Sequence, residues 1–368
     1  MRIVYFTHSL RSCWNHGNAH FLRGVLSELI ARGHDVRVFE PEGAWSLANL
    51  RNDHGEPGLR AFREAYPELS SRTYRRPEEG AAQAWSADLV IVHEWNDPEL
   101  VAAVGRLRSR GGRFTLLFHD THHRAISAPR EMRAYDLNAY DGVLAFGDAL
   151  ADVYRRWGWS QVFVWHEAAD TRRFRPPAEE RLREGLVWIG NWGDNERSAE
   201  LVEFLLKPAR EADLPLDIYG VRYPDAARQK LRQFGACYHG WLANAAAPRE
   251  FAKHLVTVHV PRRFYAGSLP GIPTIRVFEA LACGIPLVSA PWDDCEHLFR
   301  VDRDFLMVRS GAEMTAVLRD LKSDPDLRAM LAANGLQTIR NRHSCAHRVD
   351  ELLGIAERLR APVLESAA

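Results

Sequence analysis

The sequence predicts two doubly wound α/β domains, each built on a mainly parallel sheet. The chain has 368 residues, and at about 100–200 residues per domain this length suggests two cores. Short apolar runs alternate with helical patterns from one end to the other, as in successive βαβ units. Within these runs apolar and polar residues do not alternate, which is typical of strands buried on both faces of a parallel sheet.

The first domain is expected at 1–175. After the first strand and a polar loop, apolar residues recur at helical spacing from Phe21 to Ile30. Gly33 then predicts the end of this helix, because glycine readily adopts the left-handed conformation found at helix ends. The predicted strands of this half are Ile3–Phe6, Val36–Phe39, Asp88–Val92, Phe114–Phe118, Val143–Phe146 and Val162–Trp165.

A second domain is expected at 176–345, where the same pattern restarts. Phe174-Arg175-Pro176-Pro177 and the charged stretch that follows are typical of a linker. Residues 324–360 have a helical pattern, and the end of the chain, at about 346–368, is a candidate to return to the first domain. The predicted strands of this half are Leu186–Ile189, Leu216–Tyr219, Cys237–His239, Leu255–Val260 and Ile285–Ser289.

Composition excludes several classes of protein. Lys and Arg together number 48, as do Asp and Glu, and this balance argues against a nucleic-acid partner. The five cysteines form no C-x-x-C pair, which favours a reducing compartment over a disulfide framework or a zinc ribbon. No apolar run is long enough for a transmembrane segment, and no signal peptide is recognisable. We therefore expect a cytoplasmic protein, for which peripheral membrane contact stays open.

Polar and His-rich loops follow strand after strand, at the strand ends where open α/β sheets bind ligands. They predict a ligand-lined cleft between the domains. The loop Asn15-His16-Gly17-Asn18 is suited to face a phosphate or a sugar, because Gly17 permits a close backbone approach. The run from His119 to His123, which includes His122, has three interpretations: a sugar site, a metal site and a structural or solvated loop. No metal is expected, since successive residues of one loop rarely supply a tetrahedral site alone.

The segment from Leu269 to Ser289 is the most informative. Pro and Gly prevent regular structure until Thr274, a favourable N-cap, after which a helix of about nine residues ends at Gly284. The N-terminus of that helix is a ready anion site, suited to a pyrophosphate. Arg276 and Glu279 share one helix face, so Arg276 could contact a phosphate while Glu279 accepts both hydroxyls of a ribose. The alternative is an ordinary helix N-terminus with a solvated ion pair.

The run RVFEALACGIPLVSAPWDDCEHLF at 276–299 resembles the donor-site segment of GT-B retaining glycosyltransferases of the group 1 (family 4) type. Within these it is most similar to the branch with spore-maturation-type members. The runs RNRHSCAHRVDELL at 340–353 and GNAHFLRGVLSELIARGHDV at 17–36 are similar to the same group. The resemblance implies the GT-B fold, in which two Rossmann-like domains face each other across a cleft. It also implies that the second domain binds a nucleotide-sugar donor without a metal or another cofactor, and that the first meets the acceptor.

The resemblance further implies roles for single residues. Glu279 matches the second carboxylate of the family's Glu-x7-Glu motif, which binds the nucleotide ribose, whereas Gly271 stands where the first carboxylate would fall. Backbone amides of 271–274 could take its place, unless the donor sugar is unusual or activity is reduced. His119 resembles the histidine that such enzymes aim at the transferring sugar. The expected donor-binding residues are Arg197, Arg222, Gly271, Ile272, Pro273, Thr274, Arg276 and Glu279, and the expected acceptor- or sugar-facing ones are Asn15, His16, Gly17, Asn18 and His122.

We therefore expect a hexosyltransferase-type enzyme of polysaccharide or glycoconjugate synthesis. It would move a sugar, with retention of configuration, from a nucleotide-diphosphate sugar to a hydroxyl of a glycan or small-molecule acceptor. Two alternatives stay open: a catalytically silent module that binds nucleotide or sugar, which Gly271 favours, and a sugar-nucleotide epimerase. The absence of a G-x-G-x-x-G run counts against an NAD-dependent dehydrogenase.

Overall fold

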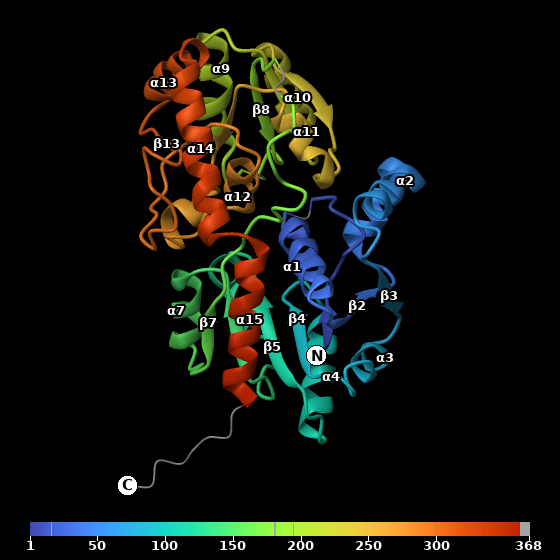
Figure 1. Ribbon diagram of the computed structural model, residues 1–368. Helices are drawn as coiled ribbons and strands as arrows, with labels where there is room; N and C mark the ends of the chain where they lie inside the picture. Colours follow the sequence, from blue (N-terminus) through green and yellow to red (C-terminus); the bar gives the residue numbers. More distant parts are fainter. Residues whose placement is uncertain (16, 180–181, 194, 361–368) are drawn as a thin grey trace, which may run out of the picture.

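The computed structural model describes all residues except 16, 180–181, 194 and 361–368, and its two lobes each contain a parallel sheet (Figure 1). The first sheet has seven strands in the order β3-β2-β1-β4-β5-β6-β7, and the second has six in the order β10-β9-β8-β11-β12-β13. In each sheet the strand order reverses beside the first strand of that half, β1 or β8, and such switch points favour ligand binding. The predicted pair of doubly wound α/β domains is confirmed.

The central strands of the first sheet are completely covered. Every residue of β4 and of β5 is buried, because helices pack on both faces of a parallel sheet. The sequence pattern does not predict β3, whose Ser-Arg-Thr-Tyr is mostly polar and lies at the sheet edge with only Tyr74 buried. The strands are β1 (Arg2–Phe6), β2 (Asp35–Pro41), β3 (Ser71–Tyr74), β4 (Leu89–His93), β5 (Thr115–Asp120), β6 (Gly142–Ala145) and β7 (Val162–Val164).

Helices connect these strands. One of them, α2, is kinked at Gly55, whose φ of 55° and ψ of −148° are not helical, two residues before Pro57. The helices of this half are α1 (Ala19–Ala31), α2 (Trp45–Ala65), α3 (Pro77–Ala82), α4 (Pro98–Ser109), α5 (Arg124–Ser127), α6 (Pro129–Met132) and α7 (Asp148–Arg156).

The second sheet begins at β8, beyond the predicted linker. Its strands are β8 (Leu186–Ile189), β9 (Leu216–Tyr219), β10 (Cys237–Gly240), β11 (Val256–His259), β12 (Leu287–Ser289) and β13 (Leu306–Met307). Its helices are α8 (Ser198–Leu201), α9 (Lys207–Glu211), α10 (Asp225–Gln233), α11 (Ala247–Phe251), α12 (Ile275–Ala282), α13 (Gly311–Ser323) and α14 (Pro325–Arg342), with short π or 3-10 turns η1 (Val202–Leu206), η2 (Asn244–Ala246) and η3 (Phe264–Ser268). None of the helices in the described part of the chain is long and apolar enough to cross a membrane.

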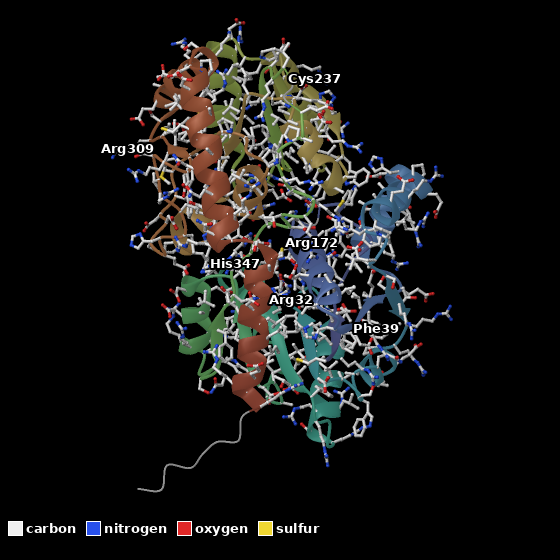
Figure 2. The ribbon with its side chains drawn as sticks, in the orientation of Figure 1. Arg32, Phe39, Arg172, Cys237, Arg309 and His347 are labelled. Atoms are coloured by element: carbon white, nitrogen blue, oxygen red, sulfur yellow. The ribbon has the colours of Figure 1, made fainter. Side chains whose placement is uncertain are left out.

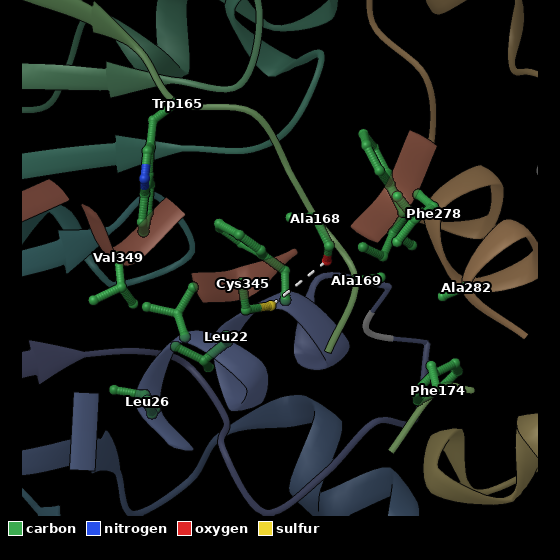
Figure 3. Packing of buried hydrophobic residues seen from close by; sticks show 14 of the residues in the cluster. Leu22, Leu26, Trp165, Ala168, Ala169, Phe174, Phe278, Ala282, Cys345 and Val349 are labelled. Atoms are coloured by element: carbon green, nitrogen blue, oxygen red, sulfur yellow. Dashed lines mark hydrogen bonds between the residues drawn. The ribbon is translucent and has the colours of Figure 1, made fainter. Parts of the chain in front are cut away.

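The last helix, α15 (Cys345–Arg360), packs on the first lobe (Figure 1). Leu22 and Leu26 of α1 lie near Cys345 and Val349 of α15 in one buried cluster (Figure 3). The helices approach closely because α1 has Gly24 at the contact, where a Cβ would lie only 2.5 Å from the Cys345 sulfur. The chain therefore crosses between the lobes a second time.

Polar contacts hold α15 in the same place. The indole N–H of Trp165 donates to the Arg348 carbonyl at 2.8 Å. Arg32, at the end of α1, is labelled beside α15 in Figure 2. It donates to the Ala346 carbonyl at 3.1 Å and pairs with Asp350. These bonds join the C-terminal helix to α1 and to the segment after β7.

A segment of the second half also packs into the first. Leu269 and Ile272 are buried in the same apolar cluster as the side chains of β4, β5 and β6. Glu296 reinforces this junction, since one carboxylate oxygen accepts from the Asp148 N–H at 3.0 Å and the other lies 3.1 Å from His166 Nε2. The two lobes are thus joined by apolar and charged contacts.

Candidate active site

A cavity of about 610 Å³ lies between the two halves, within the range of small-molecule sites. The first half contributes to its wall His8, Cys13, Asn15, Gly17, Asn18, Trp45, Trp95, Thr121, His122, His123, Phe146 and Glu167. The second half contributes Ile189, Gly190, Asn191, Glu196, Arg197, Gly220, Val221, Arg222, Trp241, Leu242, Asn244, Arg262, Tyr265, Thr274, Ile275 and Arg276. Most of these residues follow the carboxyl ends of strands, as the sequence predicts.

Helix α12 presents its N-terminus to the cavity. Thr274, Ile275 and Arg276 line the wall, and Thr274 holds the N-cap position with an extended ψ of 159°. The Thr274 side chain caps no backbone N–H, and the first N–H groups of a helix have no partner within it. These groups and the helix dipole together favour an anion.

Arg197 is the most unusual cation of the cavity. Only 9% of it is exposed, yet its hydrogen bonds to the described residues all go to uncharged oxygens: the Val260 carbonyl at 3.0 Å, and the Asn191 carbonyl and side-chain oxygen at 3.0 and 2.9 Å. Its Nε has no hydrogen-bond partner. Burial and the nearby charge of Arg262 lower the pKa of Arg197 to about 9. A buried cation without a carboxylate in contact is suited to an anionic ligand.

Three more arginines line the same wall. Arg262 pairs with Glu196 and also donates to the Asn191 side-chain oxygen at 3.2 Å. Arg276 pairs with Glu279, which lies one turn further along α12. Arg222 follows β9 and has a φ of 60°. The predicted donor-site arginines, Arg197, Arg222 and Arg276, therefore all line one cavity.

Glu279 lies behind this wall. It is completely buried, and it is not among the residues that line the cavity. One of its oxygens accepts from Asn244 Nδ2 at 2.7 Å and lies 3.3 Å from His20 Nδ1, while the other accepts from Arg276. Burial raises the pKa of Glu279, although Arg276 and Asn244 oppose this shift. Glu279 thus orients Asn244 and Arg276, and the predicted contact to a ribose requires one of these two side chains to move.

The placement of His119 does not fit its predicted role at the sugar. Strand β5 extends to Asp120, two residues beyond the predicted strand, so that His119 is a completely buried strand residue outside the cavity wall. Its Nδ1 shares a 2.6 Å hydrogen bond with the Tyr5 hydroxyl, and burial lowers the pKa of His119 to about 3. His122 and His123, which follow β5, line the cavity instead.

The first loop lies where the sequence predicts it. Asn15, Gly17 and Asn18 line the cavity, whereas His16 lies outside the described residues. The Asn15 side-chain oxygen accepts from Asn191 Nδ2 at 2.7 Å, a bond between the two halves. Asn18 Nδ2 donates to Glu167 at 3.0 Å, and burial raises the pKa of Glu167 to about 8.

Gly271, Ile272 and Pro273 do not line the cavity, in contrast to their predicted contact with the donor. The N–H of Gly271 donates to the Asp293 carbonyl at 2.6 Å, and Ile272 packs into the first lobe. A Cβ at position 271 would lie 2.7 Å from both Cγ and Oε1 of Glu296. The Glu296 carboxylate therefore fills the space that a larger side chain at 271 would need.

The lining residues that the sequence analysis does not single out include Trp45, Trp95, Glu167, Trp241 and Arg262. Arg262 and Trp241 closely follow β11 and β10, so their positions after strands were the available signal. Trp45 begins a helix, and nothing in the local pattern distinguishes it from a packing residue.

The residues that could hold a metal lie elsewhere. Within the described ranges, ligand atoms of Asp217, Cys237 and His239 lie within 4.8 Å of one another. These residues belong to β9 and β10 and do not line the cavity. The Asp217 carboxylate already makes hydrogen bonds to His239 at 2.6 Å and to His254 at 2.9 Å.

Two family models match the sequence, one on each half. Residues 17–173 match the Glycosyltransferase Family 4 model, and residues 197–354 match the Glycosyl transferase-like model. No curated protein sequence matches the chain.

Several solved structures have the same fold. An alpha-glucosyltransferase in complex with UDP and a 13-mer DNA has a TM-score of 0.70 at 12% identity, over 97% of this chain and 99% of that one. The HepE protein of Anabaena, in complex with UDP and glucose, has a TM-score of 0.70 at 13% identity, over 97% and 99%. Sucrose-phosphate synthase from Thermosynechococcus elongatus has a TM-score of 0.66 at 15% identity, over 97% and 98%. The two matched segments are thus each similar to a glycosyltransferase family model, and the chain has the GT-B fold of the solved glycosyltransferases.

Proposed function

We propose that the protein transfers a hexosyl group from a UDP-sugar to an acceptor hydroxyl. The observation that carries this proposal is the buried Arg197, which pairs with no carboxylate of the described residues and lines the same cavity as the N-terminus of α12. A diphosphate bound there would accept charge-assisted hydrogen bonds from Arg197 and Arg276 and from the free N–H groups of the helix. Uridine as the base is supported by the structurally similar proteins that were solved with UDP.

In the proposed reaction the bond between the anomeric carbon and the diphosphate breaks, and its electron pair leaves with UDP. The acceptor oxygen forms the new bond to that carbon and releases its proton. Negative charge grows on the departing diphosphate, where the arginines and the helix dipole stabilise it without a metal ion. Retention of configuration and the spore-maturation-type branch are part of the proposal, as are a cytoplasmic location and domains at 1–175 and 176–345.

Turnover of UDP-sugars tests this proposal against its two alternatives. The protein is incubated with each of several UDP-sugars, with and without a mixture of neutral glycosides and oligosaccharides. The products are then identified by chromatography and mass spectrometry. A transferase releases UDP and adds one sugar to an acceptor. An epimerase converts the donor without releasing UDP, and a silent module binds UDP without converting any donor. Either of the last two results would contradict the proposal.

A further inference from the structure

We propose that the first-half wall of the cavity binds an uncharged acceptor with a flat apolar face, of the glycoside or oligosaccharide class, and disfavours polyanions such as DNA. This inference rests on the proposed donor site, because the acceptor must meet the sugar held there. The residues that carry the inference lie on the first-half wall and make none of the proposed contacts to the diphosphate.

Charge is divided unequally between the two walls. All cationic Arg and Lys side chains among the described lining residues come from the second half: Arg197, Arg222, Arg262 and Arg276. On the first-half wall the described lining residues include no Arg or Lys, and their single carboxyl group is that of Glu167. Proteins hold nucleic-acid phosphates mainly with Arg and Lys side chains. The described residues of this wall therefore offer no cationic side chain to an anionic acceptor, and the four arginines belong to the half that holds the proposed donor site.

Two arginines of the first half, Arg124 and Arg11, are already paired with carboxylates. Arg124 lies with its guanidinium carbon 4.6 Å from the Trp95 ring centroid, and it pairs with the buried Glu94 at 2.9 Å. Arg11 pairs with the buried Glu40 at 3.2 Å. Neither arginine lines the cavity. They support the wall without giving it positive charge.

Aromatic rings take the place of charge on this wall. Trp45 remains 38% exposed although it lines the cavity, and its ring stacks on that of His8 at 5.6 Å with an angle of 8° between the planes. Trp95 contacts the edge of the His122 ring at 5.2 Å. Exposed aromatic surface in a concave site is typical of binding to flat apolar faces, such as the C–H face of a sugar ring or an aryl group.

Uncharged polar atoms lie beside these rings. The side-chain oxygen of Asn18 and Nδ1 of His122 are buried without a hydrogen-bond partner among the described residues, and both residues line the cavity. Buried polar atoms are normally paired, so these two are suited to the hydroxyls of a ligand. Burial lowers the pKa of His8 to about 3 and that of His122 well below its usual value, which leaves both rings uncharged at neutral pH. The wall therefore combines apolar faces with neutral hydrogen-bonding groups.

Binding by the UDP-saturated full-length protein tests the inference. The probes are a series of p-nitrophenyl glycosides, a set of neutral oligosaccharides and a 13-mer DNA duplex with a hydroxymethylated pyrimidine, at about 50 and 300 mM NaCl. The variants are Trp45→Ala and Trp95→Ala. Trp85→Ala is the matched control, because Trp85 is 56% exposed and does not line the cavity. UDP affinity is measured for every variant.

We expect at least one neutral glycoside or oligosaccharide to bind with little dependence on salt. Trp45→Ala or Trp95→Ala should weaken that binding about tenfold. Trp85→Ala should not, and UDP affinity should stay unchanged in all three variants. Preferential binding of the DNA, no binding of any neutral probe, or neutral binding that both tryptophan variants leave intact would overturn the inference. If the wild-type protein does not bind UDP, the proposed donor site is overturned instead. Glycoside titrations without UDP would then still test whether the first-half wall binds a neutral acceptor.

Discussion

Replacing Gly271 with alanine should destabilise the protein at the junction between its two halves. Gly271 has a φ of 81°, in the left-handed region, and a Cβ there would lie 2.7 Å from Cγ and Oε1 of Glu296. Glu296 cannot move away freely, because its carboxylate accepts from the Asp148 N–H at 3.0 Å and lies 3.1 Å from His166 Nε2.

Two contributions to the free energy of unfolding add in this variant. A residue other than glycine in the left-handed region costs about 1–2 kcal/mol. Displacement of the Glu296 carboxylate from Asp148 and His166 costs about 1–3 kcal/mol more. We therefore expect a loss of about 2–5 kcal/mol, which at roughly 2–4 °C per kcal/mol lowers Tm by about 4–20 °C.

Urea and thermal unfolding followed by circular dichroism measure this loss. Gly354→Ala is the matched control, since a Cβ at 354 in α15 meets no atom within 4 Å and alanine favours a helix by about 1 kcal/mol. In a Glu296→Ala background, Gly271→Ala should cost mainly the backbone contribution of about 1–2 kcal/mol, because the Cys295 sulfur, 3.0 Å from the added Cβ, is the close neighbour that remains. A Gly271→Ala variant as stable as the wild type, or an equal loss in both backgrounds, would refute the steric role of Glu296.

Two further predictions concern buried ionisable and polar groups. The pKa of Glu167 is raised by burial from 4.5 to about 8, so its ionisation opposes folding, and wild-type stability should fall as pH rises through that range. Glu167→Gln should flatten this part of the profile in urea titrations at several pH values, and an unchanged slope would argue against the buried carboxyl. Tyr5→Phe should cost about 1–3 kcal/mol of stability because it leaves Nδ1 of His119 unpaired in the core. UDP affinity measured by calorimetry should not change in Tyr5→Phe. A loss of UDP affinity in this variant would indicate that His119 belongs to the ligand site.

Two strands of the second sheet could be predicted closely from local pattern. The predicted strands Leu186–Ile189 and Leu216–Tyr219 match β8 and β9 to the residue. Turn signals on both sides of these short runs leave little choice of where each strand begins and ends. The edge strand β3 and the two-residue β13 could not, since one is polar and the other too short to form a pattern.

The site could be predicted only where position in the chain determines function. Thr274 and Arg276 follow from the helix signals around α12, whereas Arg197 comes from the family resemblance, as the nearest match to a basic residue expected after the first strand of the second domain. His119 lies in the strand and not in the loop because β5 continues two residues further than its apolar run, and this moves the start of the loop toward His122. The placement of the other predicted site residues depends on long-range packing. Glu296, for example, occupies the space next to Gly271. No local pattern contains that information.

Calorimetric titration with UDP and with uridine tests the central claim, that the arginines and the N-terminus of α12 bind a diphosphate. UDP should bind in the micromolar range, uridine much more weakly, and Arg276→Met should weaken UDP binding at least about tenfold, or roughly 1.4 kcal/mol. Arg309→Met, which alters an exposed arginine outside the cavity, should leave UDP affinity unchanged. If uridine binds as tightly as UDP, or if Arg276→Met binds UDP as the wild type does, the diphosphate site lies elsewhere and the account is contradicted.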